Sequence, residues 1–277
     1  MYKCLFVHTR RAIFCPKVLF NLREKVMRSF REKFNFDPQR KLFVGVEREC
    51  FLTREGKIVP IAHEIISKLH GKGNYGYELS ACQLEMRTNP AKVKNISRIL
   101  NKSHVRLRMH EEMYGFKTLH TEVAPYDMPL DVYPDPTGRY QVITKDMPSH
   151  ILQAACRVAG THVHVGMPSA EKAIHAYNAA ILHLPTLCKM GDKSEGERLQ
   201  IYKVMAPDFN PPQYKDWNEF EEYATTHNFT DNPRNCWHMI RISVHGTIEF
   251  RVFGATPYPE EIVKWAHVCH DICKSAL

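Results

Sequence analysis

Four short segments of this 277-residue chain alternate hydrophobic and polar residues. Because successive side chains of a strand point to opposite faces, such alternation predicts strands with one apolar and one polar face. The first segment runs on to a turn at 54–57 and the last follows a turn at His245-Gly246, so both are predicted to lie in hairpins. The four patterns are VGVEREC at 44–50, CQLEMRT at 82–88, GTHVHVG at 160–166 and GTIEFRV at 246–252.

Hydrophobic residues at spacings of three and four predict helices between and around these strands. Two segments, 71–76 and 123–149, are rich in Gly or in Pro, Asp and Tyr, and are predicted to be loops. Hairpins mixed with helices predict an α+β fold, in which an open antiparallel β-sheet carries helices packed on one face. The predicted helices span about 17–35, 62–69, 91–114, 170–184, 216–223 and 259–275.

The composition, 44% hydrophobic and 25% charged, is that of a globular protein, and no apolar run approaches the ~20 residues of a membrane helix. The net charge of +8 lies in residues 1–41, which hold 11 basic and 3 acidic residues, whereas 42–277 hold 27 of each. A neutral body argues against a nucleic-acid-binding face, since phosphate affinity needs clustered cations. We therefore predict a basic N-terminal helical extension over 1–40, solvated or peripheral, and a single domain over 41–277.

Nine cysteines are scattered without a CxxC pair, which indicates a reducing compartment and mostly buried thiols. The first twenty residues are basic and acid-free, but Arg10, Arg11 and Pro16 interrupt the apolar run that a signal peptide needs. A cytoplasmic location is the expectation, with a transit peptide or an early start codon as the alternatives.

The polar faces of the four strands carry carboxylates, imidazoles and arginines rather than a mixture of neutral groups. For any one strand, a solvated sheet face is the ordinary interpretation. Several carboxylates on one sheet repel each other, however, and they need cations to stay ionised. Mg²⁺ binds oxygen ligands and leaves positions for phosphates, and an arginine beside it suits phosphoryl transfer. The residues that share these faces are Glu47 with Glu49, Gln83 with Glu85 and Arg87, His162 with His164, and Glu249 with Arg251.

Five motifs in a fixed order resemble those of the glutamate–cysteine ligases, especially the short bacterial carboxylate–amine ligases grouped with them. The resemblance covers about residues 41–256. It implies a fold similar to the glutamine synthetase catalytic domain, with a metal–nucleotide site on the concave face of the sheet. The motifs are GVERECFL at 45–52, GYELSACQLEMRTNP at 76–90, AGTHVHVGMPSAEKAIHAYN at 159–178, PDFNPPQYKDWNEFEEYA at 207–224 and GTIEFRV at 246–252.

The resemblance also implies an activity, that of an ATP-dependent ligase forming an amide or γ-glutamyl bond through an acyl phosphate. Glutamate and cysteine are the reference substrates, ATP and Mg²⁺ the cofactors with Mn²⁺ as the alternative ion, and a homodimer the assembly. Arg251 and Glu85 would be catalytic, and Arg251, Arg198 and Gln83 would contact the nucleotide. The implied metal ligands are Glu47, Glu49, Glu78, Glu85, His162 and Glu249.

Two other interpretations stay open. His162 and His164 on one strand, with Glu47 or Glu85, would also suit a zinc-dependent hydrolase. A non-catalytic relative would instead bind a nucleotide or an amino acid, with a partner held by the basic N-terminal helix. Amine-dependent ADP release, metal content, and ATP binding without turnover distinguish the three.

Overall fold

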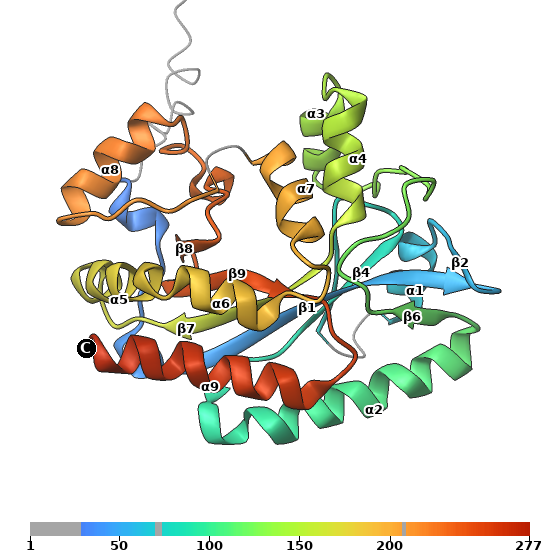
Figure 1. Ribbon diagram of the computed structural model, residues 1–277, viewed down its shortest axis with the longest axis horizontal. Helices are drawn as coiled ribbons and strands as arrows, with labels where there is room; N and C mark the ends of the chain where they lie inside the picture. Colours follow the sequence, from blue (N-terminus) through green and yellow to red (C-terminus); the bar gives the residue numbers. More distant parts are fainter. Residues whose placement is uncertain (1–28, 70–73, 207–208) are drawn as a thin grey trace, which may run out of the picture.

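The structure, a computed structural model, describes residues 29–69, 74–206 and 209–277. Its strands are β1 (Phe43–Arg54), β2 (Lys57–Ile58), β3 (Tyr75–Tyr77), β4 (Gln83–Arg87), β5 (Ala91–Lys92), β6 (Lys117–Leu119), β7 (Gly160–Gly166), β8 (Ile240–Ser243) and β9 (Thr247–Gly254). Within the described residues they form one sheet in which every pairing is antiparallel. The main order is β3-β4-β1-β7-β9-β8, and β2, β5 and β6 pair with β1 (Figure 1). The long strand β1 is therefore the element around which the sheet is built.

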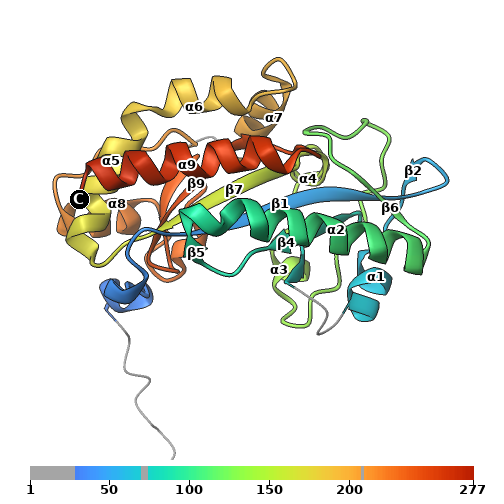
Figure 2. The ribbon, with the colours of Figure 1, turned by 90° about the horizontal axis from the view of Figure 1, so that it is seen from below.

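The helices are α1 (Ala62–Leu69), α2 (Ile96–Tyr114), α3 (Arg139–Thr144), α4 (Ser149–Arg157), α5 (Ala170–Leu182), α6 (Leu184–Gly191), α7 (Glu197–Met205), α8 (Trp217–Thr226) and α9 (Pro259–Ser275). Helices α1, α2, α5, α6 and α9 pack on the apolar face of the sheet, whereas α3, α4, α7 and α8 lie on the opposite side (Figures 1 and 2). The open antiparallel sheet confirms the predicted α+β class, although helices lie on both sides of the sheet rather than on one face alone. In the described parts of the chain, no helix is both long and apolar enough to cross a bilayer.

Strand alternation decides which residues reach the apolar side. Val44 and Val46 of β1, with Val163 and Val165 of β7, are at most 1% exposed and share one core cluster with residues of α5 and α9. Burying a valine side chain contributes about 1.5–3 kcal/mol. Because these four residues hold the two strands against the helix layer, the polar residues between them are fixed on the other face.

The segment before β1 packs onto α8. Phe30 and Phe34 are 2% and 6% exposed, and their ring centroids lie 5.8 and 5.0 Å from that of Trp217. The predicted helix over 17–35 is wrong for its last turns, which form one 3-10 turn (Arg31–Lys33) followed by extended backbone; its earlier part lies outside the described residues. The aromatic spacing that suggested a helix serves instead to fill an aromatic cluster against α8.

Three other boundaries differ from the prediction. Helix α2 begins at Ile96 rather than at 91, because the residues after Pro90 first form β5 and a 3-10 turn. The predicted loop 123–149 contains α3, and the predicted loop 71–76 ends in β3. Helices α4, α6 and α7 have no counterpart in the prediction. The α3 sequence has no buried residue, so it lacks the hydrophobic periodicity by which a helix is recognised.

Candidate active site

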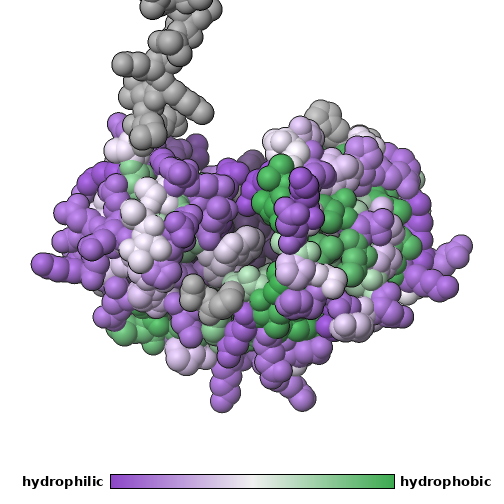
Figure 3. Space-filling model, turned by 90° about the horizontal axis from the view of Figure 1, so that it is seen from above, coloured by the Kyte–Doolittle hydropathy of each residue, from purple (hydrophilic) through white to green (hydrophobic). Residues whose placement is uncertain are grey.

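The polar faces of the central strands line one cavity. It has a volume of about 810 Å³ and is bordered by residues of α3, α4 and α7. Figure 3, seen from the side on which α3, α4, α7 and α8 lie, shows the surface hollowed between them. Every residue to which the sequence assigned a role lines this cavity: Glu47, Glu49, Glu78, Gln83, Glu85, His162, Arg198, Glu249 and Arg251. The structure thus brings the whole predicted set together, while the role of each member stays a prediction.

The strand register explains why the carboxylates of different strands converge. In the pairing of β1 with β4, Glu49 lies opposite Glu85, and in the pairing of β1 with β7, Glu47 lies opposite His162. Directly opposed residues of an antiparallel pair have neighbouring side chains. The acidic pair alone would be unfavourable, so this register needs positive charge nearby.

Glu47, His164 and Glu249 form the tightest group of metal-binding side chains. Each offers one ligand atom, and these three atoms lie within 4.8 Å of one another. Among the described residues, this is the group of His, Cys, Asp or Glu side chains whose ligand atoms lie that close together. Nδ1 of His164 hydrogen bonds with Oγ1 of Thr247 at 2.9 Å, which orients the ring. Its Nε2 is buried without a hydrogen-bond partner, although Oε2 of Glu47 is 3.4 Å away. A buried orphan nitrogen beside two carboxylates fits a divalent cation that takes nitrogen and oxygen ligands.

His162, which was predicted to be a metal ligand, lies beside two other predicted ligands. Its Nδ1 lies 3.3 Å from Oε2 of Glu47 and its Nε2 lies 3.5 Å from Oε1 of Glu49. It therefore bridges the two carboxylates of β1. His164, which was considered as a ligand only for the zinc interpretation, belongs to the tightest group with Glu47 and Glu249, and the ligand role of His162 stays a prediction.

Two arginines hold the carboxylate of Glu249, which is 1% exposed. Arg241 of β8 donates to both of its oxygens, at 2.8 and 3.0 Å, and Arg251 donates to Oε1 at 2.7 Å. Burial opposes ionisation of Glu249, but Arg241, His164 and Arg251 outweigh it and hold its pKa well below the ordinary value. Burial likewise opposes ionisation of Glu47, and the charge on His164 helps to keep its pKa well below the ordinary value. Both side chains are ready to bind a cation as carboxylates.

Arg241 was missed by the sequence analysis, although a signal for it existed. In the β8–β9 hairpin Ser243 lies opposite Thr247, so the antiparallel register places Arg241 opposite Glu249. The hairpin itself was predicted from the turn at His245-Gly246. Counting outward from that turn would have paired the two charges.

Two further predicted carboxylates, Glu85 and Glu78, have raised pKa values. Burial, and then the charge of Glu47, raise the pKa of Glu85 to about 8, although Nε of Arg87 lies 3.1 Å from Oε2 of Glu85. Burial, with Glu49 and Glu85 nearby, raises the pKa of Glu78 well above its ordinary value. Both shifts arise first from burial and then from neighbouring carboxylates, and a bound metal ion or a cationic substrate would oppose them.

Two of the three side chains predicted to contact a nucleotide, Gln83 and Arg198, bond mainly to the protein backbone. Nε2 of Gln83 donates to the carbonyl of Val158 at 2.7 Å. Arg198, which is 4% exposed, donates to the carbonyls of Ala159, Arg251 and Val252. These contacts tie α7 to the ends of β7 and β9, so both side chains support the cavity wall.

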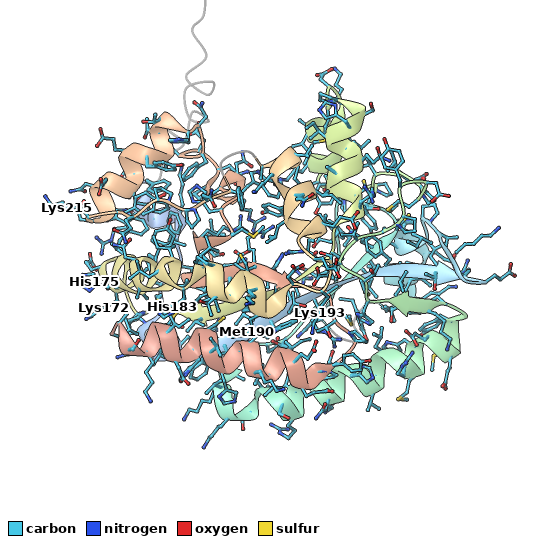
Figure 4. All side chains as sticks on the ribbon, viewed as in Figure 1. Lys172, His175, His183, Met190, Lys193 and Lys215 are labelled. Atoms are coloured by element: carbon cyan, nitrogen blue, oxygen red, sulfur yellow. The ribbon has the colours of Figure 1, made fainter. Side chains whose placement is uncertain are left out.

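Two histidines outside the cavity, His175 and His183, lie at the surface. His175 and His183 are exposed on and just after α5, and their side chains point outward from the molecule (Figure 4). His162 and His164 are only 5% and 8% exposed. His110 of α2 and His238 are buried to a similar degree, so burial alone does not distinguish the two strand histidines; their position among the carboxylates of the cavity does.

Comparison with known proteins places the chain among ligases. The model of Glutamate-cysteine ligase family 2 matches residues 43–277. A Rubrobacter xylanophilus protein named "Putative glutamate--cysteine ligase 2-3" is 27% identical over 253 aligned residues, which cover 84% of this chain and 69% of that protein. A Natronomonas pharaonis protein named "Glutamate--cysteine ligase" is 24% identical over 242 aligned residues, covering 79% of this chain and 66% of that protein.

Among solved structures, a bifunctional glutathione synthetase from Pasteurella multocida has a similar fold. The TM-score is 0.58 at 14% identity, and the match covers 85% of this chain and 39% of that one. At this identity the likeness concerns the fold alone. The chain thus spans about two thirds of the length of these two curated relatives and about two fifths of the solved structure.

Proposed function

This chain belongs to glutamate–cysteine ligase family 2, and from that premise we propose that it is an ATP-dependent carboxylate–amine ligase. One observation carries the proposal: a carboxylate–imidazole group and two arginines meet at the floor of one cavity. An enzyme that joins two substrates through ATP must hold several phosphate and carboxylate charges close together. A cavity with cations and metal-binding groups at one point, and room beside it, suits that task.

The proposed division of roles follows from the geometry. Glu47, His164 and Glu249 would hold a Mg²⁺ ion, which when bound offsets phosphate charge and positions the phosphates. Arg251 would hold the transferred phosphoryl group by bidentate hydrogen bonds. Its guanidinium is already oriented, because it donates to Glu249 at 2.7 Å and to the hydroxyl of Tyr202 at 3.3 Å.

The proposed reaction has two steps. A carboxylate oxygen of the first substrate bonds to the γ-phosphorus of ATP while the bond to the ADP oxygen breaks, which gives an acyl phosphate. The amine nitrogen of the second substrate then bonds to the carbonyl carbon, inorganic phosphate leaves, and the nitrogen gives up a proton. Glutamate and cysteine are the reference substrates. Since no covalent bond to the enzyme forms, the residues act by orientation and by balancing charge.

An ADP-release assay tests the proposal. Purified protein is incubated with ATP, Mg²⁺, glutamate and a panel of amines, and ADP should accumulate only when both a carboxylate and an amine are present. Glu47→Gln should lower that rate by about 100-fold or more, since it removes a carboxylate from the proposed metal-binding group. Glu64→Gln is the matched control, because Glu64 lies on α1 and pairs with Arg54 and Lys68 outside the cavity.

Two results would contradict the proposal. One is the absence of amine-dependent ADP release across a broad panel, with ATP bound but not consumed, which is the behaviour of a non-catalytic relative. The other is turnover without ATP by protein that retains zinc, which is the behaviour of a hydrolase.

A further inference from the structure

The cavity has two unlike walls on either side of its carboxylate floor. One wall, from α7 and the segment before β8, carries Tyr202, Arg234 and Trp237. The other, from α3, α4 and the short segment between them, carries the apolar side chains of Ile143, Met147 and Ile151. Figure 3 shows hydrophobic surface on the α3–α4 side of the hollow. Walls of different chemistry indicate that different substrate groups contact them.

The Trp237 wall adjoins the phosphoryl side of the site. The guanidinium of Arg251 lies 5.8 Å from the ring centroid of Trp237, and it also donates to the Tyr202 hydroxyl. The indole is 40% exposed and therefore offers a flat surface on which a nucleotide base can stack. If Arg251 holds the transferred phosphoryl group, the nucleotide belongs on this side, and the α3–α4 wall is left for the second substrate.

The α3–α4 wall presents apolar groups to the cavity. Ile143, Met147 and Ile151 follow one another at intervals of four residues and line it, although Ile143 is 39% exposed. Apolar surface in a cavity favours a ligand that covers it with apolar atoms. Val142, the neighbouring residue of α3, is 74% exposed and does not line the cavity. Of these two adjacent side chains, Ile143 therefore faces the cavity and Val142 faces solvent.

Charged groups of both signs flank the apolar residues. Arg139 is the first residue of α3 and lines the cavity. Its guanidinium lies 5.7 Å from the ring centroid of Tyr140. Within the described chain it forms no ion pair with a carboxylate. Glu78 and Glu85 lie near the same helix, since after burial their charges help to raise the pKa of Tyr140. A free cation, two carboxylates and an apolar surface thus share one side of the cavity.

We propose that the acceptor amine is an α-amino acid with an apolar side chain, bound at the α3–α4 wall. Its carboxylate would pair with Arg139 and its nitrogen would approach Glu78 and Glu85, with the side chain against Ile143 and its apolar neighbours. This inference rests on the proposed ligase function, and it names the substrate class that the function leaves open.

A comparison of acceptors tests the inference. With ATP, Mg²⁺ and glutamate present, leucine, methionine and phenylalanine should support ADP release with kcat/KM at least tenfold above aspartate, lysine and glycine. Leucine should also exceed 3-methylbutylamine, which lacks only the carboxylate, by at least tenfold. Arg139→Met should abolish that second difference and keep the preference for apolar acceptors. Charged acceptors that react as well as apolar ones would overturn the inference while leaving the ligase function intact.

Two adjacent substitutions locate the acceptor. Ile143→Asp should raise the KM for leucine at least tenfold and leave the KM for ATP within twofold, whereas Val142→Asp should change neither. Both positions are exposed, so folding should be retained. An increase in the KM for ATP instead of leucine would overturn the inference, because the wall would then hold the adenine.

Direct binding separates this inference from the ligase proposal. Saturation-transfer NMR on the ATP-free protein should detect leucine but not aspartate on the wild type and Val142→Asp, and neither on Ile143→Asp. If ADP release fails with every amine, the ligase proposal falls and this measurement still decides whether the wall binds apolar amino acids. Equal signals from leucine and aspartate on the wild type would contradict the inference.

Discussion

Arg198→Met should unfold the ends of two strands rather than simply weaken nucleotide binding. The guanidinium donates from Nε to the carbonyl of Ala159 at 3.1 Å, from Nη2 to Arg251 at 3.0 Å and from Nη1 to Val252 at 3.3 Å. All three acceptors lie at the ends of β7 and β9, next to the reacting groups. A methionine has a similar length but leaves these carbonyls without the donors that satisfy them.

The expected magnitude follows from the burial of Arg198. A buried carbonyl left without its partner costs about 1–3 kcal/mol, and three such losses at one site are not additive. Removing the arginine also removes its own desolvation cost, which offsets part of the loss. We expect the free energy of unfolding to fall by about 4 kcal/mol. In a protein of this size that corresponds to a Tm lower by about 8–16 °C.

Urea unfolding followed by circular dichroism measures the change, and calorimetry measures ATP binding on the same samples. Arg139→Met is the control, since Arg139 lines the same cavity and lies over the ring of Tyr140. Its free energy of unfolding should stay within about 0.5 kcal/mol of the wild type. An Arg198→Met protein as stable as the wild type, with much weaker ATP binding, would refute the reasoning and restore Arg198 as a nucleotide contact.

Three further outcomes follow from the structure. Phe30→Ala should lower the free energy of unfolding, measured in urea, by about 3 kcal/mol, because it removes a ring that is 2% exposed from the aromatic cluster at α8. A change below about 1 kcal/mol, roughly the scale of surface substitutions, would mean that the segment before β1 does not pack onto α8. Hydrogen bonds from Arg54 and Lys68 lower the pKa of Glu64 from 4.5 to about 2, so its stabilisation is present above pH 4.5 and lost as the pH falls toward 2. Since the Glu64 side chain is 40% exposed, the difference in unfolding free energy between wild type and Glu64→Gln should be under about 1 kcal/mol at pH 6 and vanish at pH 2, and a difference that persists at pH 2 would contradict the assignment. His164→Ala should weaken Mn²⁺ binding by about 10–100-fold in electron paramagnetic resonance titrations, and unchanged affinity would remove His164 from the metal group.

Alternation along the strands predicted the sides of the sheet correctly. Glu47 and Glu49 lie on the cavity side and Val44 and Val46 on the helix side, because a period of two leaves no other arrangement once one face is buried. That information is local, and the sequence supplies it in full.

The choice between the two strand histidines was not available from alternation. The pairing of β7 with β9 shifts register between Thr161 and Val163, so His164 lies opposite Glu249 while His162 lies at the irregularity. A bulge re-aims the side chains next to it. Its position depends on how two distant segments pack, which no local pattern reveals.

Arg48 shows a second limit of local patterns. It lies on the apolar side of β1, is 2% exposed, and donates from Nη2 to the carbonyl of Thr256 at 3.3 Å. Within a strand pattern an arginine at an apolar position cannot be interpreted without its partner, and this partner lies 208 residues further along the chain. The α3 wall of the cavity could not be predicted for a related reason, since α3 lies in a segment without helical periodicity.

Isotope transfer tests the proposed ligase chemistry most directly. The carboxylate substrate, glutamate first, is labelled with ¹⁸O in its reacting carboxylate and incubated with ATP, Mg²⁺ and the best amine from the ADP-release screen. Transfer through an acyl phosphate predicts one ¹⁸O atom in each molecule of inorganic phosphate released, measured by mass spectrometry. Phosphate free of label, released together with ADP, would contradict the ligase mechanism.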